Sequence, residues 1–109
     1  MPLPRILPAA EADILEVRAR TLAEFGASQL AEYDALLENA LEAIAENPRS
    51  GRPRPDIAPA AWVYRMDLRK RGIPHLLLYR ILDDERAEVR ALFHAAMHLK
   101  SRWLQRGSK

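Results

Sequence analysis

The sequence predicts an α+β fold of two layers, in which a helical hairpin packs on one mostly antiparallel sheet. Two observations lead to this prediction. Before residue 47 the apolar residues recur every three or four positions, as on one face of a helix, whereas beyond residue 60 they alternate or run together, as in strands. Because the helices come before most of the strands, we expect the order β-α-α-β-β-β. The 109 residues are expected to form one domain, 1–109.

The first two elements are a short strand and a helix. Pro4 would confine a strand in LPRIL to a sheet edge. Pro8 suits the first position of a helix, and Gly26 is a natural place for that helix to stop. The apolar face of this helix is predicted to consist of Ile14, Val17, Thr21, Leu22 and Phe25.

A second helix is expected directly after the first. Ser28 is predicted to cap its start, and the pair Asn47-Pro48 to end it. Because Gly26 and Ala27 form the whole connection, the two helices should make an antiparallel hairpin. The apolar stripe of the second helix is predicted to be Leu30, Tyr33, Leu37, Ala40, Leu41 and Ile44.

The second half of the sequence has the period of strands. In AAWVYRMDL, Trp62, Tyr64 and Met66 are predicted to face the core, and Arg65 the other side. IPHLLLYRIL is apolar on both faces, which predicts the central strand, and AEVRALFH is the last strand. RKRG and DDER are expected turns. The final segment, MHLKSRWLQRGSK, is expected to form a short helix or tail anchored by Trp103.

The segment between the halves is rich in proline and arginine. NPRSGRPRPDIAPAAWVYR, residues 47–65, holds four of each in nineteen residues. Prolines stiffen a connection and lower the entropy of the unfolded chain. Too little chain lies on either side to make two domains, so we expect an ordered connection rather than a flexible linker. Its first part, residues 47–61, is called the elbow below.

Composition narrows the function classes. Without cysteine the chain has no disulfide and no thiolate ligand or nucleophile, which fits a reducing compartment. No apolar run is long enough to span a bilayer, so a cytoplasmic protein is expected. Residues 1–47 hold three basic and nine acidic side chains, and residues 48–109 hold fourteen basic and six acidic ones. Either the halves present surfaces to different partners, or their charges pair across the fold.

A group of arginines on the elbow and the first strand of the meander is a candidate binding surface. It includes Arg49, Arg52, Arg54 and Arg65. Such a group can hold phosphates, but solvation or an acidic protein partner accounts for it equally well. Trp62 is expected in the core rather than as a platform for bases.

His94 is the residue best suited to acid–base chemistry, because histidine titrates near neutral pH. Arg80 and Arg90 share its parity in neighbouring strands, so the three can converge on one sheet face. A structural histidine is the alternative. His98 follows at a spacing seen in metal ligands, but no third ligand stands out, so no metal is expected. No phosphate-binding glycine loop or dinucleotide motif is present, and no cofactor is expected.

Several strings together resemble the RelE/ParE superfamily of toxins from bacterial type II toxin–antitoxin systems. They are PAAEADILEV, ALLENALEAIAENPRSGRPRPDIAP, WVYRMD, LLLYRILDDERAEVRALFH and AAMHL. The resemblance extends from about residue 4 to residue 104 and rests on the joint order of the strings. It implies a helical hairpin on a curved sheet. It also implies a small antitoxin, ParD-like and of the ribbon-helix-helix type, whose tail folds onto the hairpin and sheet.

The superfamily contains two kinds of toxin. RelE-like members are ribosome-dependent endoribonucleases that cleave mRNA, and ParE-like members inhibit DNA gyrase. Here Leu76 and Leu77 occupy the region of an arginine of the ribonucleases, and Asp56 is the only acid in the elbow. Lys70 and Lys100 are isolated, where classical RelE proteins carry a lysine cluster. The resemblance therefore favours a gyrase inhibitor that is not itself an enzyme.

The hypotheses predict different functional residues. A ribonuclease would use His94 as the acid–base group, with Arg80 or Arg65 stabilising charge on the phosphate. A gyrase inhibitor needs no catalytic residue, and nucleic acid would be met only through the antitoxin complex or the ribosome. A member that only binds antitoxin is a third hypothesis. The target-binding candidates are Arg49, Arg52, Arg54, Arg65 and Trp103.

Overall fold

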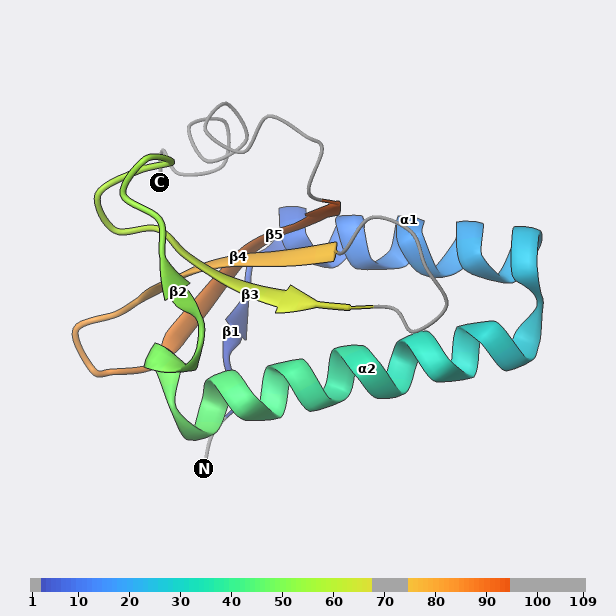
Figure 1. Cartoon of the computed structure of the whole chain (residues 1–109), viewed down its shortest axis with the longest axis horizontal. Helices are drawn as coiled ribbons and strands as arrows, with labels where there is room; N and C mark the ends of the chain where they lie inside the picture. Colours follow the sequence, from blue (N-terminus) through green and yellow to red (C-terminus); the bar gives the residue numbers. More distant parts are fainter. Residues whose placement is uncertain (1–2, 68–74, 95–109) are drawn as a thin grey trace.

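The structure is a computed structural model that describes residues 3–67 and 75–94 (Figure 1). In this part of the chain a helical hairpin packs against one sheet with the strand order β1-β5-β4-β3-β2. β1 is parallel to β5, and the other neighbouring strands are antiparallel. The predicted α+β fold is confirmed. The elements are β1 (Arg5–Ile6), α1 (Pro8–Phe25), α2 (Ala27–Glu46), the 3-10 helix η1 (Pro48–Ser50), β2 (Arg52–Pro53), β3 (Trp62–Met66), β4 (His75–Ile81) and β5 (Ala87–His94).

One glycine separates the two helices. The Gly26 N–H donates to the Leu22 carbonyl of α1, and the Gly26 carbonyl accepts from the Leu30 N–H of α2, at 3.0 and 3.1 Å. Its φ of 91° and ψ of 177° lie in a region that is essentially restricted to glycine. Since α2 begins at Ala27 with Gly26 as its cap, the predicted cap at Ser28 is wrong. The predicted stop of α1 is confirmed.

The buried face of α1 is shorter than predicted. Ala10 is fully buried, and Ile14 and Val17 pack against the core, but Leu22 and Phe25 are 49% and 64% exposed. These two residues of the predicted apolar face are therefore outside the core. Figure 1 shows the reason, because the end of the hairpin that carries these residues runs past the end of β5. Helical spacing identifies residues on one side of a helix, but not the length of the sheet beneath it.

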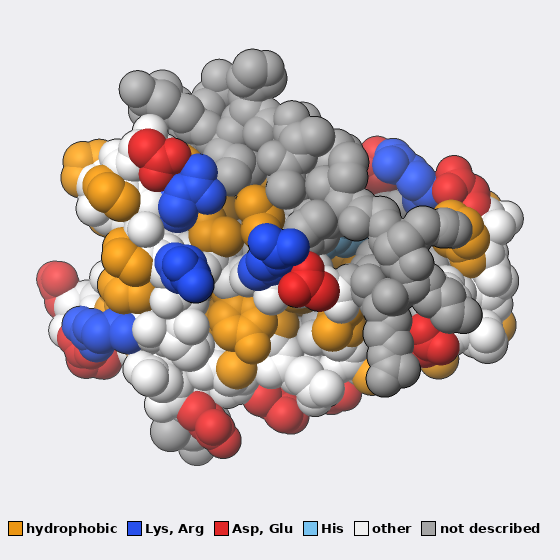
Figure 2. All heavy atoms as spheres, in the orientation of Figure 1, with side chains coloured by type: hydrophobic (Ala, Val, Ile, Leu, Met, Phe, Trp, Pro, Cys, Tyr) orange, Lys and Arg blue, Asp and Glu red, His pale blue; other side chains and the backbone are white. Residues whose placement is uncertain are grey.

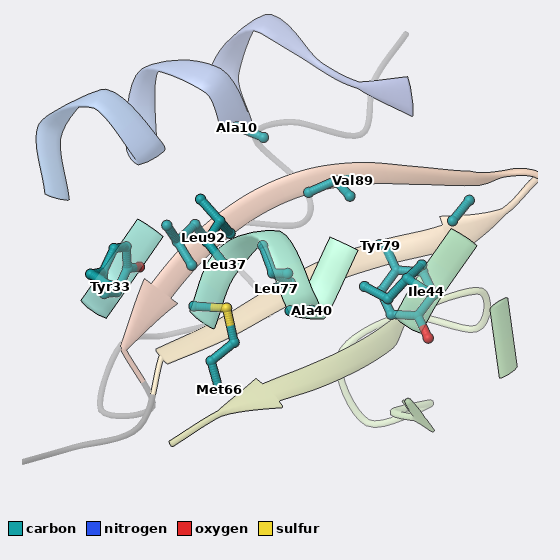
Figure 3. Packing of buried hydrophobic residues seen from close by; sticks show 11 residues of the cluster. Ala10, Tyr33, Leu37, Ala40, Ile44, Met66, Leu77, Tyr79, Val89 and Leu92 are labelled. Atoms are coloured by element: carbon teal, nitrogen blue, oxygen red, sulfur yellow. The ribbon is translucent and has the colours of Figure 1, made fainter. Parts of the chain in front are cut away.

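The larger of two hydrophobic clusters lies between the hairpin and the sheet (Figure 3). Four residues of the predicted α2 stripe are buried in it: Tyr33, Leu37, Ala40 and Ile44. Met66 of β3 is buried there too, while Trp62 and Tyr64 pack against it and stay partly exposed. The sheet contributes the remaining strand residues Leu77, Tyr79, Ala87, Val89 and Leu92.

The second cluster lies on the other face of the sheet, and residues of the elbow cover it. Ile57, Ala58 and Ala61 of the elbow pack on the strands, where Leu78 and Ala91 are fully buried. The central position predicted for β4 is confirmed, because β4 lies between β5 and β3 and is buried on both faces. The elbow is therefore part of the core as well as a connection.

A β-bulge interrupts the pairing of β4 with β5. Leu78 is opposite Ala91 and Tyr79 is opposite Val89, which leaves Arg90 as the extra residue. The predicted turn RKRG and the C-terminal helix or tail lie outside the described residues. None of the helices in the described part of the chain is long and apolar enough to cross a membrane.

Candidate functional site: an arginine-lined hollow beside the elbow

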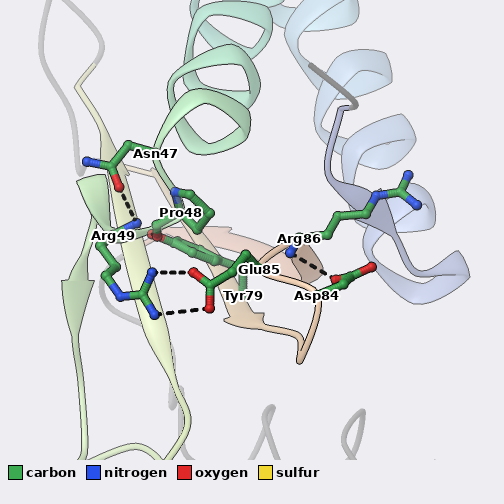
Figure 4. Close-up of polar contacts among 7 residues, drawn as sticks. All are labelled: Asn47, Pro48, Arg49, Tyr79, Asp84, Glu85 and Arg86. Atoms are coloured by element: carbon green, nitrogen blue, oxygen red, sulfur yellow. Dashed lines mark hydrogen bonds and ion pairs between the residues drawn. The ribbon is translucent and has the colours of Figure 1, made fainter.

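The elbow is held against the sheet by the phenol of Tyr79 (Figure 4). Its hydroxyl donates a hydrogen bond to the Pro48 carbonyl at 2.6 Å and accepts one from the Gly51 N–H at 3.1 Å. Burial raises the pKa of Tyr79 to about 12, so the phenol keeps its proton at neutral pH. The side chain of Asn47 accepts from the Arg49 N–H at 3.0 Å and caps η1. The ordered path predicted for the elbow is confirmed.

Gly51 lies where the elbow passes closest to the sheet. A Cβ at this position would be 2.5 Å from the Val63 carbonyl oxygen and 2.6 Å from the Tyr79 hydroxyl oxygen. Only glycine fits without a shift of backbone. Directly after it, Arg52 pairs with Val63 and Pro53 with Trp62, which forms the short edge strand β2 that the sequence did not predict.

Arg49 ties the elbow to the turn between β4 and β5. Its guanidinium contacts Glu85 at 2.6 Å, and hydrogen bonds from Arg49 lower the pKa of the Glu85 carboxyl below its usual value (Figure 4). Both side chains are more than half exposed. This member of the predicted binding group therefore has a carboxylate partner within the chain.

An open hollow of about 690 Å3 lies between the start of the elbow and β3. On this face of the molecule arginine side chains gather over β2 and β3, with hydrophobic side chains between them (Figure 2). The combination offers both cationic and apolar contacts to a ligand. The larger side chains that line the hollow are Arg52, Arg54, Val63, Tyr64, Arg65 and Leu76.

Two of the three arginines in the hollow form ion pairs with aspartates two residues further along the chain. Arg54 binds Asp56 through two hydrogen bonds of 2.9 and 2.8 Å, which lower the pKa of Asp56 below its usual value. Arg65 binds Asp67 at 2.8 Å. Arg52 is exposed and makes no ion pair with any residue that the structure describes. The five side chains together carry one net positive charge, which centres on Arg52.

Arg80 and Arg90 meet on the sheet, as predicted. Both contact the same Glu88 oxygen, at 2.8 and 3.1 Å. The Arg90 side chain is 2% exposed, and burial lowers its pKa below the usual value for arginine. The bulge places Arg90 beside Glu88 while Leu92, of the same parity, packs under the helices. The alternation of side chains between the two faces of the sheet therefore shifts by one residue at Arg90. Even-numbered residues before and after the bulge do not face the same side.

The ribonuclease candidates are spread over the sheet. Arg65 pairs with a β4 residue four positions before Arg80, a separation of about 13 Å along the strand. The side chain of His94 and the whole of Trp103 lie outside the described residues. Within the residues that the structure describes, no group of three His, Asp or Glu side chains could hold a metal ion.

Among the described side chains, the charges of the two halves do not pair with each other. Seven ion pairs join described side chains, and each one links partners within residues 1–47 or within residues 48–109. Arg18 with Asp34, which bridges α1 and α2 at 2.7 Å, is an example from the first half. Between described side chains, pairing across the fold does not occur.

An apolar surface of a different kind runs along α1. Leu15, Leu22 and Phe25 are 58%, 49% and 64% exposed. Leu15 and Leu22 are seven residues apart, so both lie on one side of the helix. We call these three residues the α1 stripe. Large exposed side chains in such an arrangement mark a site for another protein rather than for a small ligand.

Comparison with known proteins decides the family. The family model for the ParE toxin of the type II toxin–antitoxin system, parDE, matches residues 5–99. The chain belongs to the ParE toxin family. It is 31% identical over 90 residues to Toxin ParE1 of two Mycobacterium tuberculosis strains, CDC 1551 / Oshkosh and ATCC 25618 / H37Rv. Each alignment covers 83% of this chain and 86% of the relative.

Membership in the ParE toxin family confirms the resemblance noted in the sequence. It places the chain among the toxins of type II toxin–antitoxin systems, which act with an antitoxin partner. The match covers the hairpin, the elbow and every described strand. The features just described therefore belong to the toxin domain itself.

Proposed function

We propose that this chain inhibits DNA gyrase and is neutralised by a ParD-like antitoxin of the ribbon-helix-helix type. The match of residues 5–99 to the ParE toxin family carries this proposal. The spread of Arg65 and Arg80 along the sheet supports it, since the described side chains form no compact set for RNA cleavage. Gyrase acts on the chromosome, so the proposal includes a cytoplasmic site of action.

The α1 stripe is the proposed contact for the antitoxin. Its seven-residue spacing suits the apolar face of a partner helix laid along α1. A tail that folds on binding gains most where large apolar side chains are already exposed, as Leu22 and Phe25 are. Burial of this stripe would favour a stable complex at neutral pH.

The ribosome-dependent ribonuclease is the second candidate, carried by the family resemblance. The register of the strands argues against it. Arg65 pairs with Leu76 of β4, whereas His94 pairs with His75. Directly paired residues share a face of the sheet and consecutive residues alternate, so these two pairs belong to opposite faces.

A gyrase assay tests the proposal. Purified toxin is incubated with supercoiled plasmid, gyrase and ATP, and linear DNA is measured after detergent and protease treatment. We expect linear DNA to accumulate, and an equimolar amount of the cognate antitoxin to prevent it. No linear DNA at toxin concentrations that stop growth in cells would contradict the proposal.

The variant His94→Ala separates the two candidates. For a gyrase inhibitor, it should still arrest growth and still generate linear DNA. For a ribonuclease, it should abolish growth arrest and leave antitoxin binding intact. The control is Arg20→Ala, because Arg20 is an exposed α1 residue and α1 contributes no residue to the arginine-lined hollow.

A further inference from the structure

We propose that the outer edge of β3 binds an extended, acidic segment of the inhibited protein, which adds a strand to the sheet beside the arginine-lined hollow. The inference rests on the proposed function for the identity of the partner. The surface itself is defined by a strand edge with which no described residue pairs beyond β2, by the hollow next to that edge and by the charge of its arginines.

The edge of β3 is only partly covered. β2 pairs with Trp62 and Val63 alone, although β3 continues to Met66. The residues just before β2 form the 3-10 helix η1, so they do not continue as a strand beside β3. Between Tyr64 and Met66, no described residue pairs with this side of the strand.

The open side of β3 presents backbone groups. The Ala61 carbonyl accepts from the Arg54 N–H at 2.8 Å, and the Val63 carbonyl lies against Gly51, so odd-numbered residues direct their backbone groups outward. Alternation then directs the N–H and carbonyl of Arg65 to the same side. An extended segment placed there can exchange two hydrogen bonds with Arg65 and continue the line of β2.

The hollow gives such a segment places for its side chains. Ser50, Gly51, Tyr64 and Arg65 all contribute to its lining, so the open stretch of β3 forms one wall of it. Alternate side chains of an added strand would point to opposite faces of the sheet. On one face they meet Arg52 and Arg65, and beside Tyr64 they meet a half-buried aromatic ring.

The charge of the hollow indicates an acidic peptide rather than nucleic acid. Arg54 and Arg65 are engaged with Asp56 and Asp67, which leaves Arg52 as the cation without an ion pair among the described lining residues. A nucleic acid needs several cations along its backbone. A peptide needs backbone hydrogen bonds and one or two charge contacts, which is what this edge offers.

The position of the edge assigns the segment to the target rather than to the antitoxin. The α1 stripe belongs to the helix that packs on β5, whereas β3 and β2 lie at the other end of the strand order, where β3 contacts α2. The two surfaces also differ in character, since one is apolar and helical and the other is cationic and extended. They can therefore bind two partners.

Peptide binding to the purified, isotope-labelled chain tests the surface. The probe is a ten-residue peptide that alternates glutamate with valine, and the control peptide carries lysine in place of glutamate. We expect the amide signals of Val63 to Met66 to shift with the glutamate peptide only. Exchange of the Arg65 amide with solvent should slow at saturation.

A charge-reversal pair tests the role of Arg52. Arg52→Glu should weaken the glutamate peptide at least about fivefold and improve the lysine peptide. Arg20→Glu is the matched control, because Arg20 is an exposed α1 arginine with a long contact of 3.5 Å to Glu16. Equal effects of the two variants would overturn the assignment of charge to the hollow.

Two substitutions of Arg65 test the strand edge. Arg65→Ala removes the guanidinium and keeps the outward N–H, whereas Arg65→Pro removes both without touching the ladder to β4. We expect Arg65→Pro to bind the glutamate peptide several-fold more weakly than Arg65→Ala, at equal thermal stability. Equal binding by the two variants would exclude strand addition. If Arg65→Pro has a folding defect, the amide-exchange result and the Arg52→Glu variant test the surface in its place.

The same variants in the gyrase assay identify the partner. We expect Arg52→Glu and Arg65→Pro to lose linear DNA formation at least about fivefold and to retain antitoxin binding. Loss of antitoxin binding instead would overturn the assignment to the target. If the unaltered toxin fails to act on gyrase but binds the peptide, the proposed function fails while the surface stands. Binding of a single-stranded oligonucleotide at Val63 to Met66 in place of the peptide would overturn the inference.

Discussion

Gly51 and Tyr79 hold the start of the elbow between them. The glycine allows the backbone to pass within van der Waals contact of Val63, and the phenol bonds the elbow on both sides of that point. Neither residue is charged. Both decide where Arg52 is placed, because it follows Gly51 directly.

Gly51→Ala is expected to destabilise the fold. The added methyl would lie 2.5 Å from the Val63 carbonyl oxygen, so the elbow or β3 must move, at a cost of about 1–3 kcal/mol. Denaturant unfolding would measure the change. Gly26→Ala is an informative comparison, because no atom lies within 4 Å of the site and any loss there comes from the positive φ alone. A Gly51→Ala protein as stable as the unaltered one would contradict the packing shown here.

Tyr79→Phe is expected to destabilise the protein by about 1–3 kcal/mol at neutral pH, because the Pro48 carbonyl and the Gly51 N–H lose their partner. The loss should depend on pH. The phenol ionises near pH 10 in the unfolded chain, and its pKa in the fold is about 12. A raised pKa gives stability that is complete below pH 10 and declines as the pH approaches 12. Unfolding curves at pH 7 to 12 should therefore converge for the two proteins, and a constant difference would contradict this.

At the scale of elements, the local signals were sufficient to place the helices. Pro8, Gly26 and Asn47 mark helix ends through their own backbone chemistry, and α1 and α2 begin or end beside them. The strands of the meander followed from their period. β2 could not be predicted, because a two-residue strand containing Pro53 has no period, and it exists only where Tyr79 holds the preceding turn.

The candidate site was predictable only in part. The arginines are visible in the sequence, but their pairing within the chain was not predicted. Arg54 and Arg65 each precede an aspartate by two residues, and each binds it, Arg54 across a turn of the elbow and Arg65 at the end of β3. That spacing is a usable signal for self-paired arginines. The anchor formed by Tyr79 has no such signal, because it depends on contacts between segments about thirty residues apart.

The α1 stripe leads to a prediction at this scale. Leu22→Lys should leave thermal stability nearly unchanged, since the side chain is 49% exposed, and should weaken antitoxin binding at least about tenfold. Glu38→Lys on the exposed face of α2 is the control, and it should bind antitoxin normally. Calorimetric titration with the antitoxin measures both. Normal binding by Leu22→Lys would remove α1 from the interface.

At the scale of the whole molecule, the separated charges predict different responses to salt. Raising salt from about 0.1 to about 1 M shortens the Debye length from about 10 to about 3 Å. Binding of the acidic segment at Arg52 should then weaken several-fold, whereas binding of the antitoxin along the apolar α1 stripe should not weaken. Affinities measured at both salt concentrations test this, and equal salt dependence of the two complexes would contradict it.

The pairing of β1 with β5 bears on how the toxin is made. β1 leaves the ribosome before the helices, and its neighbour in the sheet is the last described strand. At about 5–20 residues per second, synthesis of the residues from β1 to the end of β5 takes on the order of 5–20 s. During that time α1 lacks the strand on which it packs, and the Leu7 N–H lacks its acceptor at Val89. A nascent chain that ends before β5 therefore cannot form the complete sheet. Only a chain synthesised through β5 can adopt the toxin fold.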